Sequence, residues 1–124
     1  MQTKTQMAPK VIPHTSISAK PVNMEGVKDA TIRELITAVD GAPNFAMRLF
    51  EVAPGGHTPL HDHNYEHEIF ILEGQGRLNG GDKAKPLKKG DAVFVPANAT
   101  HQFENTGPEP FKFICLIPVQ KSCT

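Results

Sequence analysis

The distribution of glycine and proline constrains the fold more than any other feature of the sequence. The 124 residues include ten glycines and eleven prolines, spread along the chain instead of being gathered in one segment. Both residues are frequent in turns, and proline also interrupts helices, so evenly spaced turn formers are typical of short strands. Long helices are therefore not expected. Aliphatic side chains must fill most of the core, because tryptophan is absent and aromatic residues make up only 6%.

Short apolar runs separate these turn formers at intervals that are typical of β-strands. Residues 30–39 fit either an amphipathic helix or a strand, and we favour a strand because nearly all of the later chain reads as β. Pro-Gly-Gly at 54–56 should end one strand, and Asn-Gly-Gly at 79–81 indicates a hairpin. The regular spacing predicts an all-β sandwich or barrel. The further strands are expected at residues 45–52, 67–72, 75–78, 92–95, 101–104 and 111–119.

The chain divides into three expected parts. Residues 1–25 read as an N-terminal arm, residues 26–120 as one barrel domain, and residues 121–124 as a C-terminal tail. Three prolines interrupt the arm, so it should either lie extended along a sheet edge or be mobile. The lysine-rich stretch 83–89 reads as a solvated loop.

Charge and composition exclude several classes of protein. Thirteen Lys and Arg balance thirteen Asp and Glu, whereas nucleic-acid-binding proteins usually carry a basic excess. No apolar run reaches the ~18 residues that a membrane-spanning helix needs, and the polar N-terminus lacks the apolar centre of a signal peptide. We therefore expect a cytoplasmic protein without nucleic-acid or membrane partners. Cys115 and Cys123 are too few for a disulfide scaffold and are expected to be free thiols.

Histidines carry the clearest chemical signal. His61, His63 and His67 lie within seven residues, and alternation along a strand would place all three on one face. His101 begins another expected strand and could supply a fourth imidazole. Imidazole is a common ligand of divalent transition metals, and several imidazoles converging inside an apolar barrel would need a metal or hydrogen-bond partners. His14 and His57 are expected to have no special role.

The histidines belong to two motifs that resemble those of the cupin superfamily. The first cupin motif reads G, five residues, HxH, three or four residues, E, six residues, G, and here Gly55, His61, His63, His67 and Gly74 follow that spacing with histidine in place of glutamate. The second reads G, five residues, PxG, two residues, H, three residues, N. It is matched by Gly90, Pro96, His101 and Asn105, with Asn98 replacing the glycine after proline.

This resemblance implies a double-stranded β-helix, the jelly-roll barrel of cupins, over roughly residues 42–119. It also implies one divalent metal per chain, and the chain is most similar to small cupins that bind manganese through four histidines. Iron, nickel, zinc and copper remain open. The register that keeps six residues before Gly74 makes His67 the third ligand, and strand parity agrees. A register with four residues after His63 would instead use Glu68.

The remaining motif residues have structural explanations. We expect Gly55, Gly74 and Gly90 to allow turn conformations that are closed to other residues. Pro96 should mark a strand end, and Asn105 should cap a turn with its side chain.

Residues that share parity with the histidines would line the metal pocket or fill the core, and core filling is the commoner role of such residues. Phe103 lies two residues after His101, and Ile69 and Ile71 follow His67. Cys115 shares a face with Phe113, so its thiol could lie near the metal or act as a small buried apolar group.

Four neutral imidazoles would leave a divalent ion with about two open positions and an undiminished positive charge. Such a site suits bidentate or anionic small molecules. The leading hypothesis is a metal-dependent, dioxygenase-type oxidoreductase that acts on a small organic substrate. A metal- or ligand-binding module without turnover is the alternative, and an isomerase is a weaker one, because no dedicated acid or base accompanies the histidines.

The last expected strand predicts a homodimer. Phe113, Cys115 and Ile117 lie on one face of it, and Ile114 and Leu116 lie on the other. A barrel strand with solvent outside should alternate apolar and polar side chains. A partner subunit would cover the second apolar face, with or without exchange of the arm.

Overall fold

The computed structural model describes residues 8–119, and nearly all of its regular structure is β. The elements are η1 (His14–Ser16), β1 (Lys20–Pro21), β2 (Lys28–Ile36), η2 (Ala38–Asp40), β3 (Phe45–His57), β4 (His67–Glu73), β5 (Gln75–Asn79), β6 (Lys85–Lys88), β7 (Ala92–Val95), β8 (Gln102–Asn105) and β9 (Phe111–Pro118). The two η segments are 3-10 helices of three residues each. Within the described range, no helix is long and apolar enough to cross a membrane.

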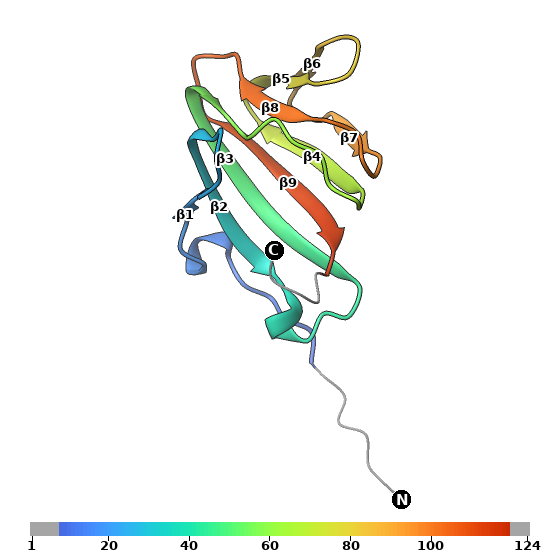
Figure 1. Cartoon of the computed structure of the whole chain (residues 1–124). Helices are drawn as coiled ribbons and strands as arrows, with labels where there is room; N and C mark the ends of the chain where they lie inside the picture. Colours follow the sequence, from blue (N-terminus) through green and yellow to red (C-terminus); the bar gives the residue numbers. More distant parts are fainter. Residues whose placement is uncertain (1–7, 120–124) are drawn as a thin grey trace, which may run out of the picture.

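The strands form one antiparallel sheet that curls on itself (Figure 1). Its main path runs β6-β5-β8-β3-β9-β4-β7, while β2 pairs with β3 and β1 pairs with β2. Strand β3 joins two halves of the sheet, β6-β5-β8 and β9-β4-β7. Most of β3 pairs with β2 and β9, and its last residue, His57, pairs with Glu104 of β8. The curled all-β barrel confirms the predicted fold class.

The core lies between the curled halves and follows from the alternation of side chains. In β9 every second residue is buried, from Phe111 to Ile117. In β4 the same alternation buries His67, Ile69 and Ile71. Because strand side chains alternate between faces, the turn formers and the period of two were sufficient to predict both strands.

Strand β3 is longer than predicted. It does not end at the Pro-Gly-Gly of residues 54–56 but continues to His57. Between the pairs Ala30–Val52 and Lys28–His57, β3 contains four residues and β2 only one, which is an extended bulge. A Cβ at Gly56 would lie 2.5 Å from the carbonyl oxygen of Lys28, so only glycine permits this close approach of the two strands. The expected turn is therefore absorbed into the bulge.

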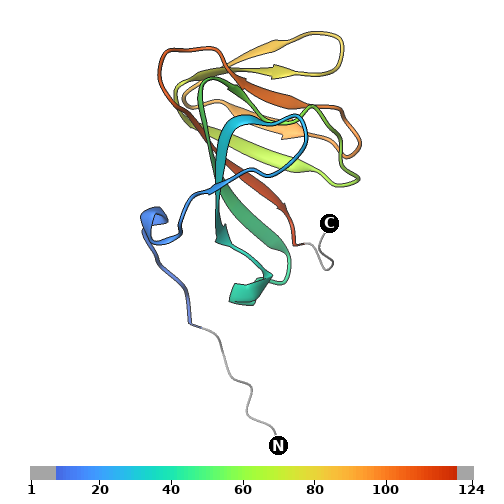
Figure 2. The same cartoon turned by 60° about the vertical axis from the view of Figure 1, so that its left-hand side comes forward.

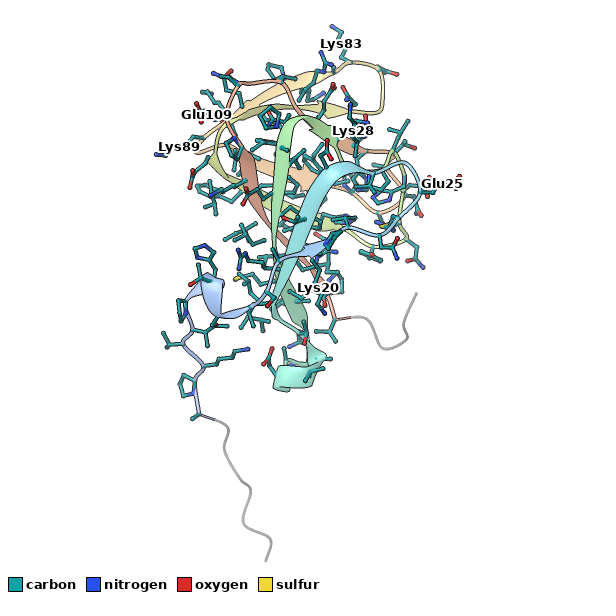
Figure 3. All side chains as sticks on the ribbon, turned by 90° about the vertical axis from the view of Figure 1, so that its left-hand side faces the viewer. Lys20, Glu25, Lys28, Lys83, Lys89 and Glu109 are labelled. Atoms are coloured by element: carbon teal, nitrogen blue, oxygen red, sulfur yellow. The ribbon has the colours of Figure 1, made fainter. Side chains whose placement is uncertain are left out.

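The predictions for residues 30–39 and 83–89 need smaller corrections. Residues 28–36 form a strand, as favoured, but 38–40 form the 3-10 helix η2, which begins with a Thr37–Asp40 capping box. The lysine-rich stretch is not only a loop, because β6 pairs with β5 and buries Leu87. Its lysines are exposed, and Lys83 and Lys89 point away from the body in Figure 3. The hairpin expected at 79–81 is confirmed by this β5–β6 pairing.

The described part of the arm follows the edge of the sheet. Lys20 and Pro21 pair with Ile32 and Thr31 of β2, and Figure 2 shows this segment beside β2. The guanidinium of Arg33 donates to the carbonyl oxygens of Ile17 and His14. Residues 1–7 of the arm, residue 120 and the tail at 121–124, which includes Cys123, lie outside the described residues.

Candidate metal centre

The four predicted histidines reach one place from two parts of the chain. His61 and His63 lie in the segment between β3 and β4, His67 is the first residue of β4, and His101 directly precedes β8. The backbone amides of His61 and His101 each donate to the carbonyl oxygen of the other, in an isolated antiparallel bridge. The bridge brings the two sequence motifs together.

The imidazole rings of these residues are close to one another. The ligand atoms of His61, His63 and His101 all lie within 4.8 Å of one another, a spacing that could hold a metal ion. The ring centroid of His67 lies 4.8 Å from that of His101 and 5.2 Å from that of His63. The tight cluster is thus a set of three, with His67 in ring contact, and His67 as a fourth ligand stays a prediction.

The strand argument that grouped the histidines was wrong for part of the segment. Residues 62–66 are not in a strand, so side-chain alternation does not place His61 and His63 on one face. The argument holds from His67 onward, where His67 is buried and Glu68 is exposed. Glu68 lies close to Glu66, and a hydrogen bond between the two raises the pKa of Glu68.

Burial keeps the imidazoles in their neutral, ligand-competent form. Together with nearby positive charges, which contribute less, burial lowers the pKa of His61 to about 4 and that of His67 to about 3. Burial also lowers the pKa of His63 and His101. The carboxylate of Asp62 opposes this effect at His61, His63 and His101 without reversing it. Near neutral pH each ring therefore has a lone pair that can bind a metal.

The donor set fits a divalent transition metal. His101 Nδ1 lies 2.9 Å from the carbonyl oxygen of Ala99, so this nitrogen must donate and Nε2 is left with a lone pair. His61 Nδ1 and His67 Nδ1 are buried and have no hydrogen-bond partner. Buried nitrogens without a partner cost free energy unless a ligand binds at the site. A metal ion bound by the lone pairs of these rings would be such a ligand.

A pocket opens beside the cluster, with a space of about 420 Å³ that includes solvent at its mouth. All four histidines line it, together with Phe103 and Cys115, which were both predicted to do so. Ile69 and Ile71 are buried in the core and do not line the pocket, so the core-filling alternative holds for them. Val22 and Met24 of the arm contribute to the wall. Glu25 and Lys28, labelled in Figure 3, mark the connection that follows Met24.

Comparisons with known proteins support the observed fold. The family model of the cupin domain matches residues 48–117. The chain belongs to the cupin family. Among solved structures, the polyketide cyclase RemF from Streptomyces resistomycificus is 35% identical with a TM-score of 0.86, covering 91% of this chain and 81% of that one.

The names of the curated relatives describe different activities. The 1-methylthio-D-xylulose 5-phosphate methylsulfurylase of Rhodospirillum rubrum is 33% identical over 60% of this cupin and 48% of its own length. The polyketide synthase CurC of Streptomyces cyaneus is 25% identical over 88% of this cupin and 69% of its own length. The cupin thus spans about half the length of the first of these relatives.

Four cupin motif positions have clear structural reasons here. Gly55, Gly74 and Gly90 all have positive φ, as predicted. Asn98, which replaces the motif glycine, has φ 69°, and asparagine is one of the few other residues that tolerate this conformation. Its backbone amide donates to the carbonyl oxygen of His63, so the left-handed turn also holds the first motif in place.

Asn105 caps its turn as predicted and does more. Its Oδ1 accepts from the amide of Gly107 at 2.8 Å. Its Nδ2 donates to the carbonyl oxygens of Glu109 and Val52, at 2.8 and 2.9 Å. The side chain therefore ties the β8–β9 turn to strand β3.

Two residues at the centre were missed by sequence reasoning. The ring of Tyr65 stacks on that of His63, with centroids 4.8 Å apart and planes at 3°. Arg48 of β3 lines the pocket with the histidines. A signal for Arg48 was available, because it lies at the same strand parity as the buried Ala46 and Val52, where a charge is unusual.

Proposed function

We propose that this cupin is a metal-dependent cyclase that acts on chains of alternating carbonyl and methylene groups, the poly-β-ketones from which aromatic polyketides form. The observation that carries the proposal is the likeness to the polyketide cyclase RemF over nine-tenths of this chain. The name of CurC, a polyketide synthase matched over 88% of this chain, supports the same substrate class. The histidine cluster and the apolar pocket beside it would form the site of such a reaction.

The proposed cofactor is one divalent metal held by His61, His63, His101 and His67. Manganese is the first candidate, with iron, nickel, zinc and copper as alternatives. When bound, the metal would supply Lewis-acid chemistry, polarising a substrate carbonyl. This makes the neighbouring methylene more acidic, and a methylene between two carbonyls needs only a weak base. The absence of a carboxylate among the pocket-lining residues is compatible with this chemistry.

The pocket walls would favour ring closure over competing reactions. Phe50, Phe103 and Phe113 line the space beside the histidines. Phe103 and Phe113 pack with centroids 4.8 Å apart, and Phe50 stacks on Phe113 at 5.2 Å. Aromatic walls exclude water and hold a flexible chain in a folded conformation, which lowers the entropic cost of bringing two carbons together.

The proposal is tested with a poly-β-ketone chain produced by a purified polyketide synthase. Products are separated by chromatography and identified by mass spectrometry, with and without metal-loaded cupin, while oxygen uptake is recorded. We expect a shift toward a single cyclised product, with loss of water and no oxygen uptake. His101→Ala should abolish the shift, and His14→Gln, which changes a histidine outside the cluster, should not. Identical products with and without the protein would refute the cyclase.

The same experiment examines two of the three hypotheses raised by the sequence. Dioxygenase-type oxidation of a small organic anion would use the same histidines and would appear as oxygen uptake with oxygenated products. A binding module would retain the metal and give neither result. Either outcome would replace the cyclase proposal.

A further inference from the structure

Arg48 places a permanent positive charge in the wall of the metal pocket. Its Cα pairs with that of Cys115 across β3 and β9, and both side chains line the pocket together with the four histidines. The charge acts on the histidine cluster, because its electrostatic repulsion contributes to lowering the pKa of all four histidines. Arginine stays protonated in proteins, so this charge is present at every working pH.

No charged group in the described part of the chain forms an ion pair with Arg48. The ion pairs of these residues involve Lys10, Arg77, Lys88 and Lys112 but not Arg48. Glu34 lies opposite Arg48 in the register of β2 and β3, but its side chain is exposed and forms no ion pair with it. The Cys115 thiol does not act as a counter-ion to Arg48 either, because burial raises the pKa of the thiol and keeps it neutral.

The hydrogen-bond donors of Arg48 are also incompletely used. Nη2 donates to Cys115 Sγ at 3.2 Å, a weak acceptor. Nε is buried and has no partner. The guanidinium carbon lies 5.1 Å from the ring centroid of Phe50, a contact that offsets part of the cost of burying the charge but accepts no conventional hydrogen bond. A partly buried cation with unused donors is stabilised when an anion binds beside it.

We propose that Arg48 binds a negatively charged oxygen of the substrate, so that this pocket selects small organic anions whose charge is delocalised, as in an enolate or a carboxylate. The assignment rests on the proposed function for the type of molecule, because a poly-β-ketone forms enolates readily. Binding of an anion by Arg48 can be tested without the cyclisation reaction. The guanidinium holds the charged oxygen and orients the rest of the molecule toward the histidines.

The test measures binding of four aromatic probes to metal-loaded protein by calorimetry. Benzoate stands for a carboxylate and 4-nitrophenolate, at a pH where it is ionised, for an enolate. Benzamide and 4-nitroanisole are their neutral counterparts. We expect at least one anion to bind more tightly than its neutral counterpart, and Arg48→Met to weaken that anion by about 10- to 100-fold while leaving the neutral probe unchanged. Which anion responds identifies the carboxylate or the enolate as the preferred chemistry.

Two further variants keep the result interpretable. Arg48→Gln retains hydrogen-bond donors without the charge and should resemble Arg48→Met, whereas Arg48→Lys should fall between them and the unchanged protein. Arg77→Met removes an arginine that pairs with Glu104 outside the pocket and should have no effect. Equal anion affinity in the unchanged protein and the Arg48 variants would overturn the proposal. So would loss of metal from all three Arg48 variants, since Arg48 would then support the centre and not a ligand. Failure of cyclisation with intact Arg48-dependent binding would refute only the proposed function.

Discussion

His61 and His101 exchange two backbone hydrogen bonds across a single antiparallel bridge. The distance from His61 N to His101 O is 3.1 Å, and that from His101 N to His61 O is 2.8 Å. Their ring centroids lie 4.8 Å apart. One residue belongs to the first cupin motif and the other to the second, forty positions later in the sequence. The bridge fixes the backbone of both residues, so two imidazoles are oriented before any metal arrives. Preorganisation of this kind lowers the entropic cost of assembling the site.

The first prediction separates His67 from its neighbour Glu68. His67 is buried in contact with the rings of His63 and His101, whereas Glu68 is exposed on the opposite face of β4. We expect His67→Ala to weaken metal binding by at least about tenfold, as loss of a ligand would, and Glu68→Ala to leave metal content unchanged. Titration of both variants with metal checks this. Retention of metal by His67→Ala and its loss from Glu68→Ala would mean that the site uses three histidines and a glutamate.

The second prediction concerns stability and pH in the metal-free protein. The folded-state pKa values of His61 and His67, about 4 and about 3, lie below the ordinary value of 6.5. The unfolded chain therefore binds more protons than the folded one below about pH 6.5, and the stability present above that pH is lost progressively as pH falls. We expect the melting temperature to decrease from about pH 7 to about pH 5. His67→Gln should flatten this dependence, and His14→Gln should not. A melting temperature that is constant over this range would contradict the account.

The third prediction tests the role of Asn105, which is only 3% exposed. Asn105→Ala would remove three hydrogen bonds, to the carbonyl oxygens of Val52 and Glu109 and from the amide of Gly107. We expect the free energy of unfolding to fall by about 2–4 kcal/mol, measured by denaturant titration. Asn79→Ala is the matched control, because its partners, the side chains of Gln102 and Glu104, can turn to water. Equal losses in the two variants would contradict the proposed role.

The fold was predictable where side chains alternate regularly and turn formers stand at both ends. Strands β4 and β9 meet both conditions. The extension of β3 to His57 was not, because Pro-Gly-Gly at 54–56 has the local chemistry of a turn and only pairing with β2 converts it into a bulge. Strand β6 was hidden for another reason. Its lysines dominate the pattern, and Leu87 is its one buried side chain.

The candidate site was predictable in its histidines and not in its surroundings. Motif spacing identified the four histidines even though the strand argument for His61 and His63 fails, since the connection between β3 and β4 is irregular. Met24 lines the pocket through the path of the arm, which no local pattern encodes. Arg48 was detectable from its inward parity, but its missing counter-ion is visible only when the neighbouring strands are in place.

The fourth prediction is the homodimer. On the outer face of β4 and β7, Phe70 is 48% and Phe94 is 62% exposed. Ile114 and Leu116 of β9 lie in the same cross-strand rows, opposite Phe70 and Glu68. We expect a second copy to cover this face. Light scattering at micromolar concentration should give the mass of two chains, Phe94→Glu should give one, and Lys83→Glu, a charge change on an exposed loop, should still give two. A monomeric mass for the unchanged protein would contradict the dimer.

The metal is the central claim, and its direct test is elemental analysis of protein purified without a metal-chelating column. The close spacing and neutral state of the histidines predict about one divalent transition metal per chain. His101→Ala should lose it, because this residue belongs to the tight cluster and also forms the bridge to His61. His57→Ala, which changes a histidine outside the cluster, should retain it. If the unchanged protein contains no stoichiometric metal after expression in metal-supplemented medium, or if His101→Ala binds it equally well, the account is wrong.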